Sequence, residues 1–199
     1  MRSLDTRSVN LIFLPYAGAG FYAYRDFRKY LPDFIQITAL DLPGHGKRMN
    51  ESLLTDIHEI VKDIFHQIKD NLETPYAFYG HSMGASLGYL LTNLIADAGE
   101  IARPRHLFFS GKSGPMAEEE RALHKLPKRD LIDALLEYGG IPGEVLDHEE
   151  LLDLFLPILR ADFQALGNYV YESTVPLDIP MTVMPVSYTH LTLPTILLV

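Results

Sequence analysis

The chain has 199 residues, of which 47% are hydrophobic, and this content is enough for one well-packed domain. Its formal net charge of −9, without a basic block, argues against nucleic acid or an anionic membrane as a partner and favours a small molecule or another protein. The chain has no cysteine, which excludes disulfides and thiolate metal sites. The first residues lack the apolar segment of a signal peptide, and no apolar stretch reaches about 18 residues, so we expect a cytoplasmic protein without a transmembrane helix.

Short apolar runs flanked by Gly, Pro or Asp predict buried parallel strands at Val9–Leu14, 34–40, 75–79, 106–110 and 179–184. Apolar residues spaced by three and four predict an amphipathic helix over 50–72, with Asn50 or Ser52 as its N-cap. A further helix is predicted over 85–96. The alternation of strands and helices predicts an α/β fold with a doubly wound, mostly parallel sheet, whose ligands bind at the carboxyl ends of its strands.

The alternation stops between 113 and 166, where helix-like pieces at 129–138 and 149–166 flank a glycine-rich stretch at 139–143. We interpret this region as a helical insertion over the sheet. Its functional interpretation is a lid that shapes an acyl pocket, and the alternative, that it is simply more core, remains open at this stage. We therefore predict one domain over 1–186, with the lid at about 113–166.

The sequence Gly-His-Ser-Met-Gly at 80–84 lies between an apolar run and a helix-like run. This context is typical of the nucleophile elbow of α/β-hydrolases, in which a serine sits on a strained strand-to-helix turn and glycines prevent a clash of backbones. The motif predicts Ser82 as a nucleophile and the backbone N–H of Met83 as one donor of an oxyanion hole. A second donor is expected from the loop at 14–20, Leu-Pro-Tyr-Ala-Gly-Ala-Gly. A phosphate-binding role for that loop is disfavoured, because the Rossmann glycine spacing and the P-loop lysine are missing.

Motifs at 13–20, 41–48, 80–84 and 159–163 together resemble the type II thioesterases that serve nonribosomal peptide and polyketide synthetases. The resemblance implies an α/β-hydrolase fold and hydrolysis of misprimed or stalled acyl groups on the phosphopantetheine arm of a carrier protein. It implies Ser82 as the nucleophile, with the N–H groups of Ala17 and Met83 as oxyanion donors. It also implies no cofactor and no metal beyond the arm of the partner, and we expect a monomer.

The chain departs from this family after the strand expected at 179–184. Family members continue into a loop with the triad aspartate and later reach a Gly-Gly-His motif with the base, and neither is found here. We therefore expect that the acid, the base and the C-terminal strand and helix are missing. We also expect that 187–199, which resembles a translated sequencing adapter, is not native sequence. One alternative is a binding module that recognises the carrier protein without turnover. Two others are a different α/β-hydrolase esterase and an acyltransferase. The Gly-Gln-Gly loop that an acyltransferase would have is absent from the sequence.

Other residues are weak candidates for the missing groups. Asp178 precedes the last predicted strand and should lie across the sheet from Ser82, and His190 follows it too closely to return over the site. His45 is interpreted as a residue of a glycine-rich turn, and His81 as a packing residue of the elbow. The remaining histidines considered are interpreted as solvated or structural: His106, His124 and His148.

Overall fold

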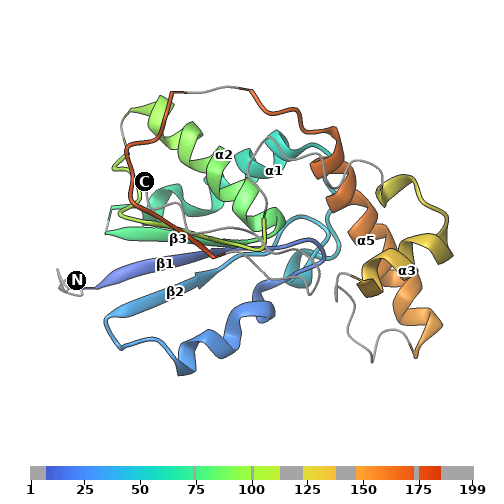
Figure 1. The fold of residues 1–199 in the computed structure, drawn as a ribbon. Helices are drawn as coiled ribbons and strands as arrows, with labels where there is room; N and C mark the ends of the chain where they lie inside the picture. Colours follow the sequence, from blue (N-terminus) through green and yellow to red (C-terminus); the bar gives the residue numbers. More distant parts are fainter. Residues whose placement is uncertain are drawn as a thin grey trace.

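The computed structural model describes residues 8–73, 75–99, 101–112, 123–137, 147–172 and 175–184 (Figure 1). Its centre is a five-stranded parallel sheet in the order β2-β1-β3-β4-β5. The strands are β1 (Val9–Leu14), β2 (Ile35–Ala39), β3 (Tyr76–His81), β4 (Leu107–Ser110) and β5 (Met181–Met184). The predicted parallel α/β sheet is confirmed, with small shifts at the strand ends. The prediction that the strand at 179–184 is buried was wrong, because β5 lies at the edge of the sheet and its four residues are exposed.

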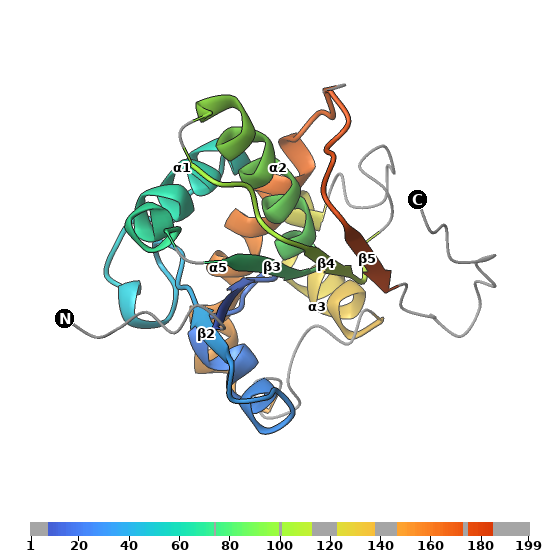
Figure 2. The ribbon, with the colours of Figure 1, turned by 90° about the vertical axis from the view of Figure 1, so that its left-hand side faces the viewer.

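Helices cover both faces of the sheet, as the doubly wound prediction requires. The helices α1 (Ile57–Ile68) and α2 (Met83–Ala98) pack on one face, and the 3-10 helix η1 (Phe21–Lys29) lies on the other (Figures 1 and 2). The apolar stripe of α1 is buried against the sheet and α2, because its buried positions recur every three or four residues: Ile57, Ile60, Val61, Ile64 and Ile68. Among the described residues, no helix has the length and apolar character needed to cross a membrane.

The predicted start of the first amphipathic helix was wrong. The helix begins at Ile57, and its N-cap is Asp56, whose carboxylate accepts hydrogen bonds from the N–H groups of His58 and Glu59. The preceding residues contain a short 3-10 helix, η2 (Gly46–Arg48), and an irregular stretch. Leu53 belongs to that stretch and packs against Gly44, where an added Cβ would overlap the leucine side chain. Leu53, whose spacing predicted that the helix begins earlier, therefore packs within the loop and does not belong to the helix.

The helical region lies beyond the carboxyl ends of the strands, where α3 and α5 gather at one end of the sheet (Figure 1). It contains η4 (Leu123–Lys125), α3 (Lys128–Glu137) and α5 (Glu149–Asn168). Helix α5 is buried along one side, while Leu151 and Leu154 on it are exposed. Arg160 fastens η4 to α5 by donating to the carbonyls of His124 and Leu126, at 2.7 Å each. The glycine-rich stretch at 139–143, residues 113–122, His190 and the expected tail at 187–199 lie outside the described residues.

Candidate active site

The turn between β3 and α2 has the strained backbone that the elbow motif predicts. Ser82 has φ 50° and ψ −118°. Among the described residues, it is the only one other than glycine that has a positive φ. A Cβ on Gly80 would overlap the carbonyl of Gly84, and a Cβ on Gly84 would overlap the carbonyl of Leu14. Both glycines are therefore required by close backbone approach, and the second one brings the elbow against the end of β1.

The elbow is anchored to the sheet and opens onto the start of a helix. The Ser82 N–H donates to the Ser110 carbonyl at 2.9 Å, which ties the turn to β4. Met83 is the first residue of α2, so its N–H has no partner within the helix and lies at the positive end of the helix dipole. The Met83 side chain is fully buried. This geometry gives the Met83 N–H a fixed position beside Ser82, as an oxyanion donor requires.

The loop that follows β1 lies next to the elbow, because Leu14 pairs with Gly80 in the register of β1 and β3. The Ala19 N–H donates to the Tyr16 carbonyl at 2.8 Å, and Gly18 has φ 76°. Ala17 keeps a negative φ, so residues 16–19 form a type II turn with Gly18 at the position that requires positive φ. The Gly18 N–H donates to Asp162 at 2.7 Å. No hydrogen bond to another described residue engages the Ala17 N–H.

His45 and Asp162 form a buried pair beside this loop. The Nε2 of His45 lies 3.0 Å from Oδ2 of Asp162, and its Nδ1 lies 3.0 Å from the Pro43 carbonyl. The side chains of His45 and Asp162 are 3% and 1% exposed, so water does not screen the pair. Burial lowers the pKa of the His45 imidazole, but the hydrogen bond and charge of Asp162, with smaller contributions from Pro43 and Asp41, outweigh it and raise this pKa above its ordinary value.

This arrangement corrects the interpretation of His45 as a residue of the turn alone. Both of its ring nitrogens have partners, the Pro43 carbonyl and Asp162, and neither has a hydrogen bond to Ser82 among the described residues. The sequence signal for the pair was Asp162 itself, an acidic residue on the apolar side of a helix between Leu159 and Phe163. A carboxylate at such a position requires a partner, and that requirement could have drawn attention to a histidine elsewhere in the chain.

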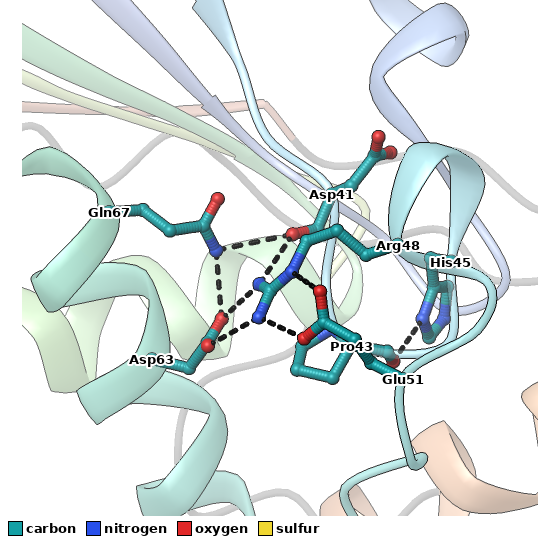
Figure 3. A network of polar contacts seen from close by, with 7 residues as sticks. All are labelled: Asp41, Pro43, His45, Arg48, Glu51, Asp63 and Gln67. Carbon is teal, nitrogen blue, oxygen red and sulfur yellow. Dashed lines mark hydrogen bonds and ion pairs between the residues drawn. The ribbon is translucent and has the colours of Figure 1, made fainter.

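The turn that carries His45 is held by a network of salt bridges and hydrogen bonds centred on Arg48 (Figure 3). The guanidinium donates to both carboxylate oxygens of Asp63 at 2.7 and 2.9 Å, to Glu51 at 2.6 and 2.8 Å, and to the Asp41 carbonyl at 3.2 Å. The hydrogen bonds to Asp63 and Glu51 raise the pKa of Arg48. Gln67 on α1 donates to the Asp41 carbonyl and to Asp63. This network joins the end of β2 to α1 and fixes the direction in which the turn leaves the sheet.

The Asp41 carboxylate points away from Arg48 in Figure 3, toward η1. It accepts the Phe21 N–H at 2.7 Å and the Lys47 N–H at 3.0 Å. Gly46 must lack a side chain, because a Cβ there would overlap this carboxylate. The motif at 41–48 is therefore a structural connection between the turn after β2 and the loop after β1.

Apart from His81, which directly precedes Ser82, the other described sequence candidates lie outside the elbow. His81 is partly buried; its Nδ1 lies 3.0 Å from Ser110 Oγ, and burial lowers its pKa. Asp178 precedes β5 and lines a cavity with Pro75 and Tyr76 at the amino ends of the strands, the end opposite the elbow. His106 contacts the Thr182 hydroxyl through Nε2 at 2.8 Å, while His124 and His148 lie in the helical region. Within the described ranges, no histidine hydrogen-bonds to Ser82, and no group of histidine and acidic residues has the arrangement of a metal site.

Comparisons with known proteins agree with this geometry. The family of the thioesterase domain matches residues 9–192. The gramicidin S biosynthesis protein GrsT of Aneurinibacillus migulanus is 34% identical over 175 residues, which cover 87% of this chain and 68% of GrsT. Among solved structures, RedJ, the thioesterase from the prodiginine biosynthetic pathway in Streptomyces coelicolor, has a TM-score of 0.82 and 31% identity over 89% of this chain and 69% of RedJ. YbtT, a type II thioesterase from the yersiniabactin pathway of nonribosomal peptide and polyketide synthesis, has a TM-score of 0.80 and 27% identity over 93% of this chain and 76% of YbtT. The chain therefore belongs to the thioesterase family and has its α/β-hydrolase fold.

Proposed function

We propose that the protein hydrolyses acyl or aminoacyl thioesters carried on the phosphopantetheine arm of a carrier protein in nonribosomal peptide or polyketide synthesis. The observation that carries the proposal is the strained Ser82 at the start of α2, directly beside the turn at 16–19. The names of its relatives, which include a gramicidin S biosynthesis protein and a type II thioesterase, support the same substrate class. The alternatives of a binding module, another esterase or an acyltransferase are not favoured by this kinship.

The reaction divides into two acyl transfers. In the first, a base removes the proton of the Ser82 hydroxyl as Oγ attacks the thioester carbonyl carbon; the carbon–sulfur bond then breaks, and the thiolate of the arm leaves with that proton. In the second, water attacks the acyl-enzyme in the same way and restores the serine. We assign the N–H groups of Ala17 and Met83 to the negative oxygen formed in each step, where one such donor contributes about 3–4 kcal/mol. No cofactor takes part in these steps.

The helical region is proposed as a lid over this site. Phe155 and Leu159 on α5 face Gly18, since an added Cβ there would lie 3.1 Å and 2.8 Å from their side-chain atoms. Apolar side chains at this position, one residue from the assigned oxyanion donor Ala17, suit the acyl chain of the substrate. We accordingly propose that the insertion at about 113–166 forms one wall of the acyl pocket.

We further propose that the base does not come from the described histidines and that the chain of 199 residues carries the nucleophile without its acid and base. His45 is engaged at both ring nitrogens, and His81 contacts Ser110. The expected consequence is slow turnover, because the oxyanion donors and substrate binding alone leave about 10³–10⁴-fold acceleration over water in hydrolases whose triad has been removed.

The test uses a carrier protein loaded with a radiolabelled acyl group, incubated with the wild-type chain, with Ser82→Ala and with the matched control Ser86→Ala. Ser86 lies on α2 and is partly buried, so the control makes the same chemical change on the same helix. We expect the label to appear on the wild type and on Ser86→Ala as an acyl-enzyme or as released acid, and to be absent from both pools for Ser82→Ala. Equal release by Ser82→Ala would refute the proposed function.

A further inference from the structure

One carboxylate oxygen joins three segments that are far apart in the sequence. Oδ2 of Asp162 accepts the N–H of Gly18 at 2.7 Å and lies 3.0 Å from Nε2 of His45. Gly18 belongs to the loop after β1, His45 to the turn after β2, and Asp162 to α5. Both side chains of the pair are almost completely buried. A carboxylate in such a place is stable only with strong partners, and here one of them is a backbone amide of the proposed oxyanion loop.

The contacts of His45 define its charge. Nδ1 faces the Pro43 carbonyl, which only accepts hydrogen bonds (Figure 3). Nε2 faces the Asp162 oxygen that already accepts the Gly18 N–H. Nδ1 therefore donates to Pro43, and in the protonated ring Nε2 donates to the Asp162 carboxylate, a form that the raised pKa of His45 favours. In that form the imidazolium lies against the same carboxylate oxygen that accepts the Gly18 N–H.

The Gly18 amide, which donates to Asp162, belongs to the peptide whose orientation distinguishes a type II turn from a type I turn. In a type II turn the peptide between the second and third residues is rotated by about half a turn relative to a type I turn. In the turn at 16–19 this is the peptide between Ala17 and Gly18. Because a peptide unit is planar, an acceptor on the Gly18 N–H fixes the direction of the Ala17 carbonyl and the ψ angle of Ala17 as well.

We propose that Asp162, paired with His45, is a positioning residue that holds the Ala17–Gly18 peptide in its type II orientation and so anchors to α5 the turn at 16–19, from which the Ala17 N–H is presented to the oxyanion. The assignment of Ala17 rests on the proposed function, whereas the control of the peptide orientation does not. Leu159 lies one turn before Asp162 on α5 and contacts the same glycine position. Helix α5 thus supplies both the acceptor and an apolar contact to the loop.

The decisive variant is Asp162→Leu, which removes the acceptor and keeps the branched shape of the side chain. We expect the exchange of the Gly18 amide with solvent deuterium, followed by NMR, to accelerate at least about tenfold, because the amide loses its buried partner. In thioester hydrolysis we expect kcat to fall about 10–100-fold with KM nearly unchanged, since the lost interaction matters in the transition state. Asp162→Asn, which keeps an oxygen acceptor without the charge, should lie between Asp162→Leu and the wild type in both measurements, and it replaces the leucine variant if that protein does not fold.

Two further variants separate positioning from general stability. His45→Gln can still donate to Asp162 and leaves the Gly18 acceptor in place, so we expect its melting temperature to fall while Gly18 exchange and kcat change less than in Asp162→Leu. Tyr76→Phe removes a hydrogen bond to the Ala102 carbonyl at the opposite end of the sheet and should leave Gly18 exchange unchanged. If kcat follows the melting temperature across all variants, the role of Asp162 is merely structural and the proposal is wrong.

The measurements also distinguish this inference from the proposed function. If the wild type turns over no faster than Ser82→Ala, the proposed function fails, and the exchange of the Gly18 amide alone decides whether Asp162 controls the peptide. Unchanged Gly18 exchange in a folded Asp162→Leu protein overturns the inference, whatever the activity.

Discussion

Replacing Gly18 with alanine tests whether α5 and the loop after β1 are packed as closely as the structure describes. Gly18 has φ 76°, and an L-residue in this region costs about 1–2 kcal/mol. The added Cβ would lie 2.8 Å from Leu159 Cδ2 and 3.1 Å from Phe155 Cε1, closer than carbon atoms normally approach. Overpacking of a well-packed site costs about 1–3 kcal/mol, so we expect Gly18→Ala to lower the free energy of unfolding by about 2–5 kcal/mol.

The chain offers a matched control for the backbone contribution. Gly99 has φ 70°, and an added Cβ would meet no atom within 4 Å. Gly99→Ala therefore carries the cost of the left-handed conformation alone, about 1–2 kcal/mol. The difference between the two variants, measured by urea unfolding with a shared m-value, isolates the contact between the loop and α5.

A double-mutant cycle identifies the contact. Leu159→Ala removes the atoms closest to the new methyl group, so Gly18→Ala should cost less in that background than in the wild type, and the contact with Phe155 accounts for any excess over Gly99→Ala. The packing argument is refuted if Gly18→Ala costs the same as Gly99→Ala in the wild-type background, or if the cycle shows no coupling between positions 18 and 159.

Two other predictions concern strain and charge. Ser82→Gly should raise the free energy of unfolding by about 1 kcal/mol, because relief of the strained backbone at φ 50° exceeds the entropic cost of a glycine. The control Ser86→Gly inside α2 should lower the free energy of unfolding by about 0.5–1 kcal/mol, and chemical denaturation measures both variants. A Ser82→Gly protein that is less stable than the wild type contradicts the strain. Because the pKa of His45 is raised above its ordinary value of 6.5, the folded chain holds this proton at pH values where the unfolded chain has released it. The contribution of His45 to stability is therefore fully present below pH 6.5 and is lost as the pH rises through the folded-state pKa. Melting temperatures measured from pH 6 upward should therefore fall more steeply for the wild type than for His45→Gln, and parallel curves would exclude the imidazolium pair.

The sheet and the elbow could be predicted because their signals are local. An apolar run flanked by Gly, Pro or Asp predicts the position of each strand, although β5 is exposed, and the strained turn at Ser82 requires small residues at fixed distances along the chain. The start of α1 could not be placed in this way. Leu53 continues the helical spacing of apolar residues, yet it packs against Gly44 in a loop, and the cap at Asp56 decides where the helix begins.

The pair of His45 and Asp162 escaped sequence reasoning for a different reason. Its members are 117 positions apart; His45 has an ordinary local explanation in a glycine-rich turn, and the apolar surroundings of Asp162 on its helix indicate that it needs a partner without indicating which residue that is. No periodicity links a turn after one strand to a helix inserted after another. The pairing follows from the parallel order of β1 and β2, which places the carboxyl ends of both strands at the end of the sheet where α5 lies (Figure 1).

The two halves of the proposed oxyanion hole are held by different parts of the molecule. The Met83 N–H is fixed by the elbow, which is tied to β4 through the Ser110 carbonyl and therefore moves with the sheet. The Ala17 N–H is fixed by the turn at 16–19, whose orientation depends on Asp162 and Leu159 of α5. A displacement of α5 would then shift the second donor relative to the first without moving Ser82. Since oxyanion stabilisation depends on donors already in place, the proposed assignment predicts that a displacement of α5 weakens the stabilisation of the oxyanion.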